Sequence, residues 1–287
     1  MNDLIPEQIV DFHVHLFPDQ LFEAIWKFFS EQYHWQIVYK MYYKQCIQYL
    51  LQNGVSHIVY SNYAHRKGVA EQLNRWNINV LNQNKNLYCF AAFHPDDDNC
   101  LQIATSVLEH PRVIGFKLHH LVQHFYPDDE RLFPLYEMVI EKNKRILFHI
   151  GNGPVESDHV GYKSFIPLLK RYPQLSVNIA HLGGNEFEPF FDLLKEHKNM
   201  MMDTSFCFSR DDAFNFNLHP EILEKNKDQL LYGSDFPNLI FPRSEEIETL
   251  ASFELSEAFY RQLFRENGKR LLDRHCTVEQ QHGEQTA

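Results

Sequence analysis

The residues best suited to chemistry in this sequence are histidines, carboxylates and one lysine beside short apolar segments. His13 and His15 alternate along one segment, so their side chains leave the same face of an extended chain and can bind one metal ion. Asp11 lies on that face and could orient one of these ligands. Four further titratable residues occupy equivalent positions near the ends of later segments: Lys117, His149, His181 and Asp235. Burying such groups together is unfavourable unless a divalent cation compensates them, so the pattern indicates a metal centre.

Eight short apolar segments recur along the chain and predict the strands that must position these side chains. They span residues 9–15, 57–61, 87–93, 113–118, 146–150, 176–181, 200–205 and 230–235. Helical patterns fill intervals between them, for example at 132–143, 165–171 and 187–198. Continuous apolar segments are typical of buried parallel strands, and eight strand–helix units predict a single (β/α)8 TIM barrel. A doubly wound sheet would need a glycine-rich turn after the first strand, where residues 15–18 read His-Leu-Phe-Pro.

The predicted barrel occupies residues 1–276 as one domain, followed by a flexible tail at 277–287. The interval after the first strand, at about 17–50, is unusually long and rich in aromatic residues. Two interpretations remain open for this insertion: a helix that packs on the barrel, or a flap that covers the site at the carboxyl ends of the strands.

Composition excludes several classes of protein. The chain has 287 residues, 27 Lys and Arg against 38 Asp and Glu, and a formal net charge of −11, which argues against binding nucleic acid or an anionic membrane. Five cysteines without a C-x-x-C pair are typical of reduced thiols, and the sequence starts without a signal-peptide pattern and has no membrane-spanning apolar stretch, so we expect a cytoplasmic protein. Its 17 histidines are an excess that a metal centre would explain in part.

Five sequence features together resemble the amidohydrolase superfamily: residues 11–18, 115–119, the strand-end His149, 181–184 (His-Leu-Gly-Gly) and 232–237 (Tyr-Gly-Ser-Asp-Phe-Pro). The resemblance covers roughly residues 7–273 and is closest to the amidohydrolase-2 type, the branch that includes amino-carboxymuconate semialdehyde decarboxylase. It supports the TIM barrel of the metal-dependent hydrolases.

The resemblance also implies a ligand set and catalytic residues. It implies that one divalent ion, best matched by zinc, is held by His13, His15, His149 and Asp235. His181 and Asp235 would be the catalytic groups that move protons. In the binuclear alternative, a carboxylated Lys117 bridges two ions. We favour one ion because the wider match is to the mononuclear branch.

Three functions remain open. A metal-activated water could hydrolyse a small-molecule ester, lactone or amide bond. The same ligands could serve a nonoxidative decarboxylase or a hydratase, which are lyases acting on a carboxylic acid. The third possible function is that of a barrel that binds a ligand without turnover. Such a barrel would not need the proton-transfer pair, His181 and Asp235. We expect a small-molecule substrate and, from the resemblance, a homodimer.

Further polar residues follow the predicted strands on the same side of the barrel and are weaker candidates for substrate contact. The basic members of this set could hold an anionic substrate through carboxylate or phosphate groups. The set consists of Arg66, His119, His120, Arg210 and Arg243.

Overall fold

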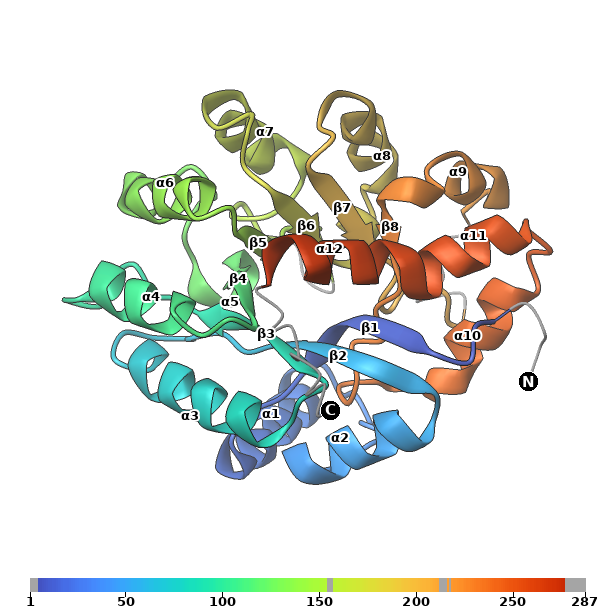
Figure 1. The fold of residues 1–287 in the computed structure, drawn as a ribbon, viewed down its shortest axis with the longest axis horizontal. Helices are drawn as coiled ribbons and strands as arrows, with labels where there is room; N and C mark the ends of the chain where they lie inside the picture. The colour runs from blue at the N-terminus through green and yellow to red at the C-terminus, as the bar shows by residue number, and fades with distance from the viewer. Residues whose placement is uncertain (1–4, 154–156, 212–215, 217, 277–287) are drawn as a thin grey trace, which may run out of the picture.

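The computed structural model describes residues 5–153, 157–211, 216 and 218–276, and the predicted tail at 277–287 lies outside them. Eight parallel strands pair in sequence order around the molecule (Figure 1). They are β1 (Ile9–His15), β2 (Val55–Ser61), β3 (Leu87–Ala92), β4 (Val113–His119), β5 (Arg145–His149), β6 (Val177–Ile179), β7 (Met200–Asp203) and β8 (Leu230–Leu231). The Phe12 amide donates to the Tyr232 carbonyl, which brings the segment after β8 back to β1 and nearly closes the barrel. The predicted TIM barrel is confirmed.

Helices alternate with the strands and surround them (Figure 1). The α-helices are α1 (Asp19–Gln32), α2 (Tyr43–Gln52), α3 (Ala70–Gln83), α4 (Cys100–Leu108), α5 (His120–Gln123), α6 (Phe133–Glu141), α7 (Tyr162–Arg171), α8 (Phe187–Glu196), α9 (Pro220–Lys225), α10 (Arg243–Ala251), α11 (Glu257–Arg261) and α12 (Asn267–His275). Short 3₁₀ segments lie at Glu130–Leu132, Ala180–Gly183 and Lys227–Gln229, and a π-helical turn at Gln262–Glu266 joins α11 to α12. No helix in these described parts is long and apolar enough to cross a membrane.

The amino end of the barrel is closed by apolar packing beneath α12. Val10 and Phe12 of β1 belong to a buried cluster with inward residues of the other strands and with Leu271 and Leu272 of α12. A Cβ atom at Gly268 would lie 2.8 Å from Val10 Cγ1, so only glycine allows α12 this close to β1. Burial of this apolar surface supplies most of the driving force for closing this end.

A buried arginine completes the amino end. Arg145 is 2% exposed, yet its Nε donates to Asn178 Oδ1 at 2.6 Å. Its Nη2 donates to the carbonyls of Val177 and Asn199 at 2.7 and 2.8 Å. The guanidinium therefore ties β5 to β6 and to the residue before β7.

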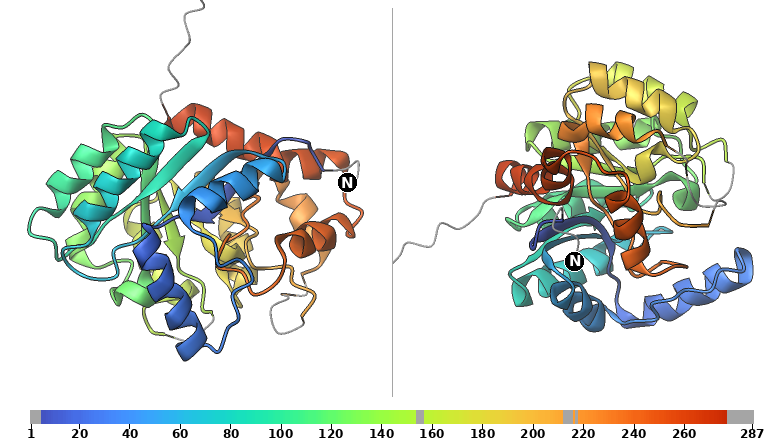
Figure 2. Two further views of the ribbon diagram at one scale, coloured as in Figure 1. Left: turned by 90° about the horizontal axis from the view of Figure 1, so that it is seen from below. Right: turned by 90° about the vertical axis from the view of Figure 1, so that its right-hand side faces the viewer.

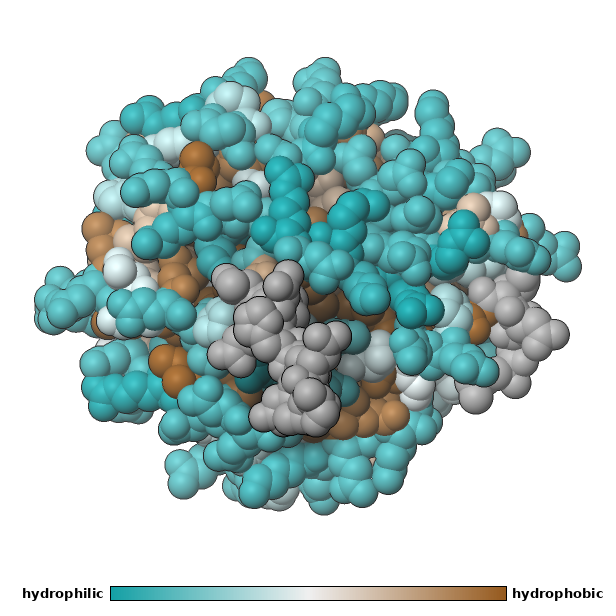
Figure 3. All heavy atoms as spheres, viewed as in Figure 1, coloured by the Kyte–Doolittle hydropathy of each residue, from teal (hydrophilic) through white to brown (hydrophobic). Residues whose placement is uncertain are grey.

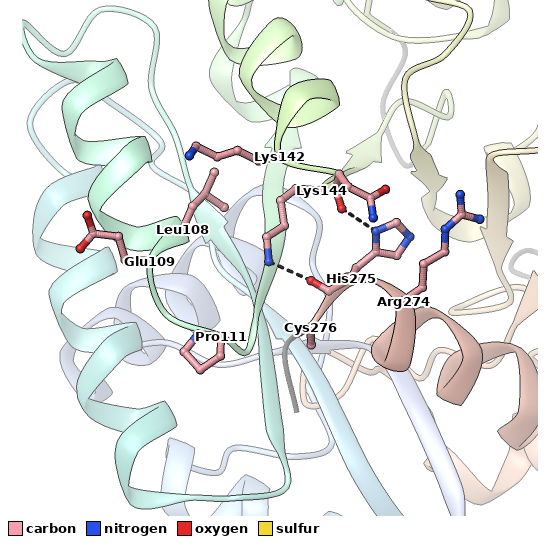
Figure 4. Close-up of a pocket in the computed structure, with 9 residues that line it drawn as sticks. Leu108, Glu109, Pro111, Lys142, Lys144, Arg274, His275 and Cys276 are labelled. Atoms are coloured by element: carbon pink, nitrogen blue, oxygen red, sulfur yellow. Dashed lines mark hydrogen bonds between the residues drawn. The ribbon is translucent and has the colours of Figure 1, made fainter. Parts of the chain in front are cut away.

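The outer surface at this end is mostly hydrophilic where α12 crosses it (Figure 3). A pocket of about 610 Å³ lies beside the end of α12, lined in part by Lys142, Lys144 and Arg274 (Figure 4). Lys144 Nζ donates to the carbonyls of Val113 and His275 at 2.7 and 2.8 Å, and three helices end nearby. Lysine and arginine are favoured at helix carboxyl ends, so these cations balance exposed carbonyl groups.

The aromatic-rich insertion folds as two helices with different contacts. Helix α2 packs on the barrel through buried residues that include Cys46 and Leu50, whereas only Phe22 of α1 is buried. Helix α1 extends from the side of the barrel opposite α12 (Figure 2). The rings of Tyr39 and Tyr49 pack on Phe236, with centroids 4.8 and 5.0 Å away, so the insertion is anchored on the loop after β8.

Candidate metal centre

Three side chains converge at the carboxyl end of the barrel. Asp235 Oδ1 lies 2.9 Å from His15 Nε2 and 3.6 Å from His13 Nε2. Each of the three residues offers one ligand atom, and these atoms all lie within 4.8 Å of one another. Asp235 Oδ1 is buried, and it has no hydrogen bond of ordinary geometry within the described chain. Ligands about 2.0–2.1 Å from one tetrahedral ion would be separated by about 3.3 Å. The donor set therefore fits a divalent cation.

The loop after β8 carries Asp235 to this position. Strand β8 ends at Leu231, earlier than predicted, because the chain turns toward β1 and the amides of Ser234 and Asp235 both donate to the His13 carbonyl. Asp235 adopts a left-handed backbone, with φ of 60°. A Cβ atom at Gly233 would lie 2.6 Å from His13 Cβ, so glycine is required for this approach.

Asp203, at the end of β7, orients the first histidine and was not singled out from the sequence. Its Oδ2 accepts a hydrogen bond from His13 Nδ1 at 2.9 Å, which leaves His13 Nε2 with a lone pair facing Asp235. Asp203 Oδ1 accepts from the amides of His181 and Ser205. The strand-end position of Asp203 within the apolar segment 200–205 was the available signal.

His149 and His181 lie beside the His13–His15–Asp235 group rather than within it. His149 Nδ1 faces His181 Nε2 at 3.2 Å. The other ring nitrogens face carbonyls: His149 Nε2 faces that of Gly153, and His181 Nδ1 that of Ser205. Those outer nitrogens must be protonated to donate, so the two facing nitrogens both present lone pairs when the rings are neutral. A proton or a cation between them would remove this conflict.

His181 lies outside β6, contrary to its predicted place at the strand end. The strand ends at Ile179, and His181 follows in the 3₁₀ segment with a φ of 55°. A left-handed backbone is unfavourable for a non-glycine residue, and such strain is concentrated at functional sites. It is compatible with a role for His181 in the reaction.

Lys117 is completely buried on β4, with its Nζ 3.4 Å from His13 Nε2. Burial lowers the pKa of Lys117 to about 8, with Asp203 and Asp235 opposing this shift. Burial likewise lowers the pKa of His13 to about 4 and that of His149 well below its usual value. Burial would raise the pKa of Asp235, but His15 and the other histidines hold it below the usual range. The arrangement thus favours an ionised Asp235 carboxylate beside a neutral His13 ring, and metal binding requires both of these protonation states.

The weaker candidates fall into two groups. His119 is buried with its ring stacked on His149, at a centroid distance of 4.0 Å, so it adjoins the metal centre. His120 is also buried, and its Nδ1 donates to the Phe125 carbonyl at 2.8 Å, which gives that ring a structural contact. Arg66 is exposed after β2.

The other two arginines are held by carboxylates of this chain. Arg210 is exposed and forms an ion pair with Glu248 of α10. Arg243 was a weaker candidate for substrate contact, but its side chain is 4% exposed and its Nε lies 3.7 Å from Asp11 Oδ2. The first turn of α10 turns Arg243 inward, so its position offers no exposed contact for a substrate.

Comparison with known families identifies the group to which this architecture belongs. Residues 10–274 match the family model described as Amidohydrolase. The chain belongs to this amidohydrolase family. Membership confirms the resemblance expected from the sequence, and it supports an enzyme that uses a divalent metal.

Solved structures share the fold at low sequence identity. A 5-carboxyvanillate decarboxylase from Novosphingobium aromaticivorans, complexed with manganese and 4-hydroxy-3-methoxy-5-nitrobenzoic acid, is 11% identical, with 95% of this chain and 99% of that chain covered and a TM-score of 0.68. A dihydroxybenzoic acid decarboxylase from a Polaromonas species, with bound manganese and 2-nitroresorcinol, is 14% identical, with 94% and 97% covered and a TM-score of 0.65.

A third similar structure represents another reaction. A candidate 2-pyrone-4,6-dicarboxylic acid hydrolase from Acinetobacter baumannii, with citric acid bound, is 15% identical, with 95% of this chain and 100% of that chain covered and a TM-score of 0.60. No significantly similar sequence was found among curated proteins. Proteins that share this fold are therefore named for hydrolysis and for decarboxylation, and the fold of this amidohydrolase is compatible with either reaction.

Proposed function

We propose that this amidohydrolase is a metal-dependent hydrolase that cleaves an ester, lactone or amide bond of a small molecule. The observation that carries the proposal is the convergence of His13, His15 and Asp235 Oδ1. This oxygen is buried 2.9 Å from His15 Nε2, without a hydrogen bond of ordinary geometry within the described chain. A buried anionic oxygen of this kind is costly unless a cation binds it.

We assign the ligand set to His13, His15, His149 and Asp235, with zinc as the preferred ion. A bound divalent ion would supply a water of lowered pKa. Asp235, whose carboxylate faces both imidazoles and whose pKa is held below the usual range, would accept a proton from the attacking water. His181 Nε2, which presents a lone pair when its Nδ1 donates to the Ser205 carbonyl, would hold or return a proton near the leaving group.

A nonoxidative decarboxylase or hydratase is the second candidate. Two structurally similar proteins are named as decarboxylases and contain manganese, which supports testing manganese beside zinc. In this case the carboxylic acid substrate would be oriented by the same metal ligands, and His181 would transfer the proton. The bound ligands of similar structures, such as citric acid, support an anionic substrate.

A two-ion form of the site is a further alternative. Lys117 Nζ lies close to His13 Nε2, and the facing nitrogens of His149 and His181 are spaced as two ligands of one ion would be. A carboxylated Lys117 would then bridge the ions. We favour one ion. From the family resemblance, we also propose a homodimer. The free cysteines and the acidic composition support a cytoplasmic protein that binds neither nucleic acid nor membranes.

The decisive experiment combines metal analysis with product analysis. Elemental analysis of protein purified without added metal should find about one equivalent of a divalent ion or its uptake on dialysis against zinc or manganese. Less than about half an equivalent, with none taken up, would contradict the metal centre. A panel of esters, lactones, amides and carboxylic acids should then be screened with a coupled carbon dioxide assay. Turnover of an ester, lactone or amide without carbon dioxide release supports the hydrolase. Stoichiometric release from a carboxylic acid supports the decarboxylase, and addition of water to a carboxylic acid without release supports the hydratase.

A further inference from the structure

Four buried polar side chains lie beside the metal centre, between β1, the end of β8 and α10. Asp11, Tyr232, Arg243 and Glu246 are all buried, and we call them the buried polar cluster. Each has at least one polar atom without a hydrogen bond of ordinary geometry to any described residue. These atoms are Asp11 Oδ2, the Tyr232 hydroxyl, Arg243 Nε and Nη2, and Glu246 Oε2.

The members of the cluster lie within electrostatic reach of one another. Arg243 Nε is 3.7 Å from Asp11 Oδ2, which is too long for a hydrogen bond. The guanidinium carbon lies 5.4 Å from the centre of the Tyr232 ring. Burial raises the pKa of the Tyr232 hydroxyl. Arg243 opposes that shift through its charge and through a close side-chain contact with the hydroxyl, and Asp11 and Glu246 reinforce it. The four residues therefore form one interacting group, and their unbonded atoms should be explained together.

The unbonded polar atoms of this cluster need hydrogen-bond partners that the described protein atoms do not provide in ordinary geometry. Buried polar atoms in native proteins are almost always hydrogen-bonded, and where protein partners are lacking, ordered water supplies the bonds. A polar contact longer than 3.5 Å, such as that between Arg243 and Asp11, is a common place for such water. We propose that the buried polar cluster binds ordered water and that Arg243, through Asp11, positions the segments that carry the metal ligands.

The positioning role follows from the other oxygen of Asp11. Asp11 Oδ1 accepts hydrogen bonds from the amide of Ser234 at 3.0 Å and from the amide of His13 at 3.4 Å. Ser234 directly precedes Asp235, so one carboxylate oxygen joins the two segments from which the ligands project. Arg243 balances the charge of that carboxylate. This part rests on the metal ligands proposed above, whereas the binding of water does not.

Whether the cluster binds water can be tested by whether removal of the Tyr232 hydroxyl raises or lowers the Tm. Removing a dry, unpaired hydroxyl relieves its lost hydration, whereas removing a hydrated hydroxyl loses a hydrogen bond. Tyr232→Phe is therefore expected to lower the Tm of the metal-free protein. Tyr136→Phe is the control, because the Tyr136 hydroxyl donates directly to the Pro127 carbonyl at 2.7 Å. An unchanged or raised Tm for Tyr232→Phe would overturn the proposal, as would a high-resolution crystal structure without water at this hydroxyl.

Metal affinity tests the positioning role. Arg243→Met should weaken binding of zinc and manganese to the metal-free protein by about 10- to 100-fold in competition with a chromophoric chelator. Arg243→Lys should restore part of the affinity because it returns the charge. Arg75→Met, which removes an exposed partner of Glu71 on α3, should match the wild type.

Separate outcomes distinguish this inference from the proposed function. If Arg243→Met lowers the Tm but leaves metal affinity unchanged, Arg243 is only structural and the positioning role is overturned. If Arg243→Met does not fold, Asp11→Asn retains an acceptor for Ser234 while removing the charge, and the same loss of affinity is expected. Wild-type protein that binds neither ion would contradict the metal centre itself, independently of the result for Tyr232→Phe.

Discussion

Both ends of the barrel bury charged groups, but the hydrogen bonds that these groups make differ. At the amino end, the Arg145 guanidinium donates to Asn178 and to the carbonyls of Val177 and Asn199. At the carboxyl end, Asp235 Oδ1 faces two imidazoles without an ordinary hydrogen bond in the described structure. Burial alone therefore does not distinguish a structural charge from a functional one. What distinguishes the two is whether the buried group makes hydrogen bonds within the protein.

The largest expected effect is the loss of the metal in a variant at the carboxyl end. His13→Ala removes one ligand nitrogen, so it should abolish metal binding and activity while leaving the fold intact. Elemental analysis, activity assays and circular dichroism would measure these effects. Retention of about one equivalent of metal with wild-type affinity would show that His13 is not a ligand.

His181→Ala, also at the carboxyl end, tests whether His181 transfers a proton or binds a metal ion. If His181 moves a proton and is not a ligand, kcat should fall by about 10²- to 10⁴-fold while the metal is retained. Parallel measurement of kcat and metal content provides the check. Loss of metal together with activity would instead favour the binuclear alternative, in which His181 binds an ion.

The matching change at the amino end should affect stability and spare the metal. Arg145→Met leaves the carbonyls of Val177 and Asn199 without their buried donor, so the free energy of unfolding should fall by about 2–4 kcal/mol. Urea unfolding would measure this change. Metal content per folded molecule should match the wild type, and a reduced content would break the distinction between the two ends.

Acid should produce the smallest of these effects through buried histidines. Burial lowers the pKa of His120 from 6.5 to about 4, so the folded state favours neutral imidazole, and its contribution is complete above pH 6.5 and lost as the pH falls toward 4. His120 alone should reduce the stability of the metal-free protein by about 2 kcal/mol between pH 7.5 and 5. His120→Asn should flatten this part of the profile in urea unfolding. An identical profile for this variant would contradict the assignment.

Much of the barrel was predictable because parallel strands buried on both faces leave continuous apolar segments in the sequence. Each of the eight predicted segments overlaps a strand. Strand ends were less predictable, since β6 and β8 stop where the backbone turns to deliver His181 and Asp235. Those turns depend on left-handed residues and on hydrogen bonds to distant carbonyls, which no local pattern records.

The candidate site was predictable in type more than in arrangement. Residues at strand ends drew attention to His13, His15 and Asp235, and these converge. Asp203 escaped notice although it occupies the same kind of position, because a single carboxylate in an apolar segment has no recognisable motif. The inward position of Arg243 depends on its pairing with Asp11, which is far away in the sequence. Side-chain pairing across the barrel has no signal in one sequence.

The packing of the aromatic insertion on Phe236 limits how this enzyme can be altered. Loops at the carboxyl end of a barrel are commonly exchanged to change specificity while the scaffold is kept. Here Tyr39 and Tyr49 rest on the residue directly after Asp235. The segment at 17–50 is therefore not an independent module. In a chimera that replaces this segment with a shorter loop from another family member, other side chains would have to pack on Phe236. Otherwise a change in specificity could not be separated from a displaced Asp235.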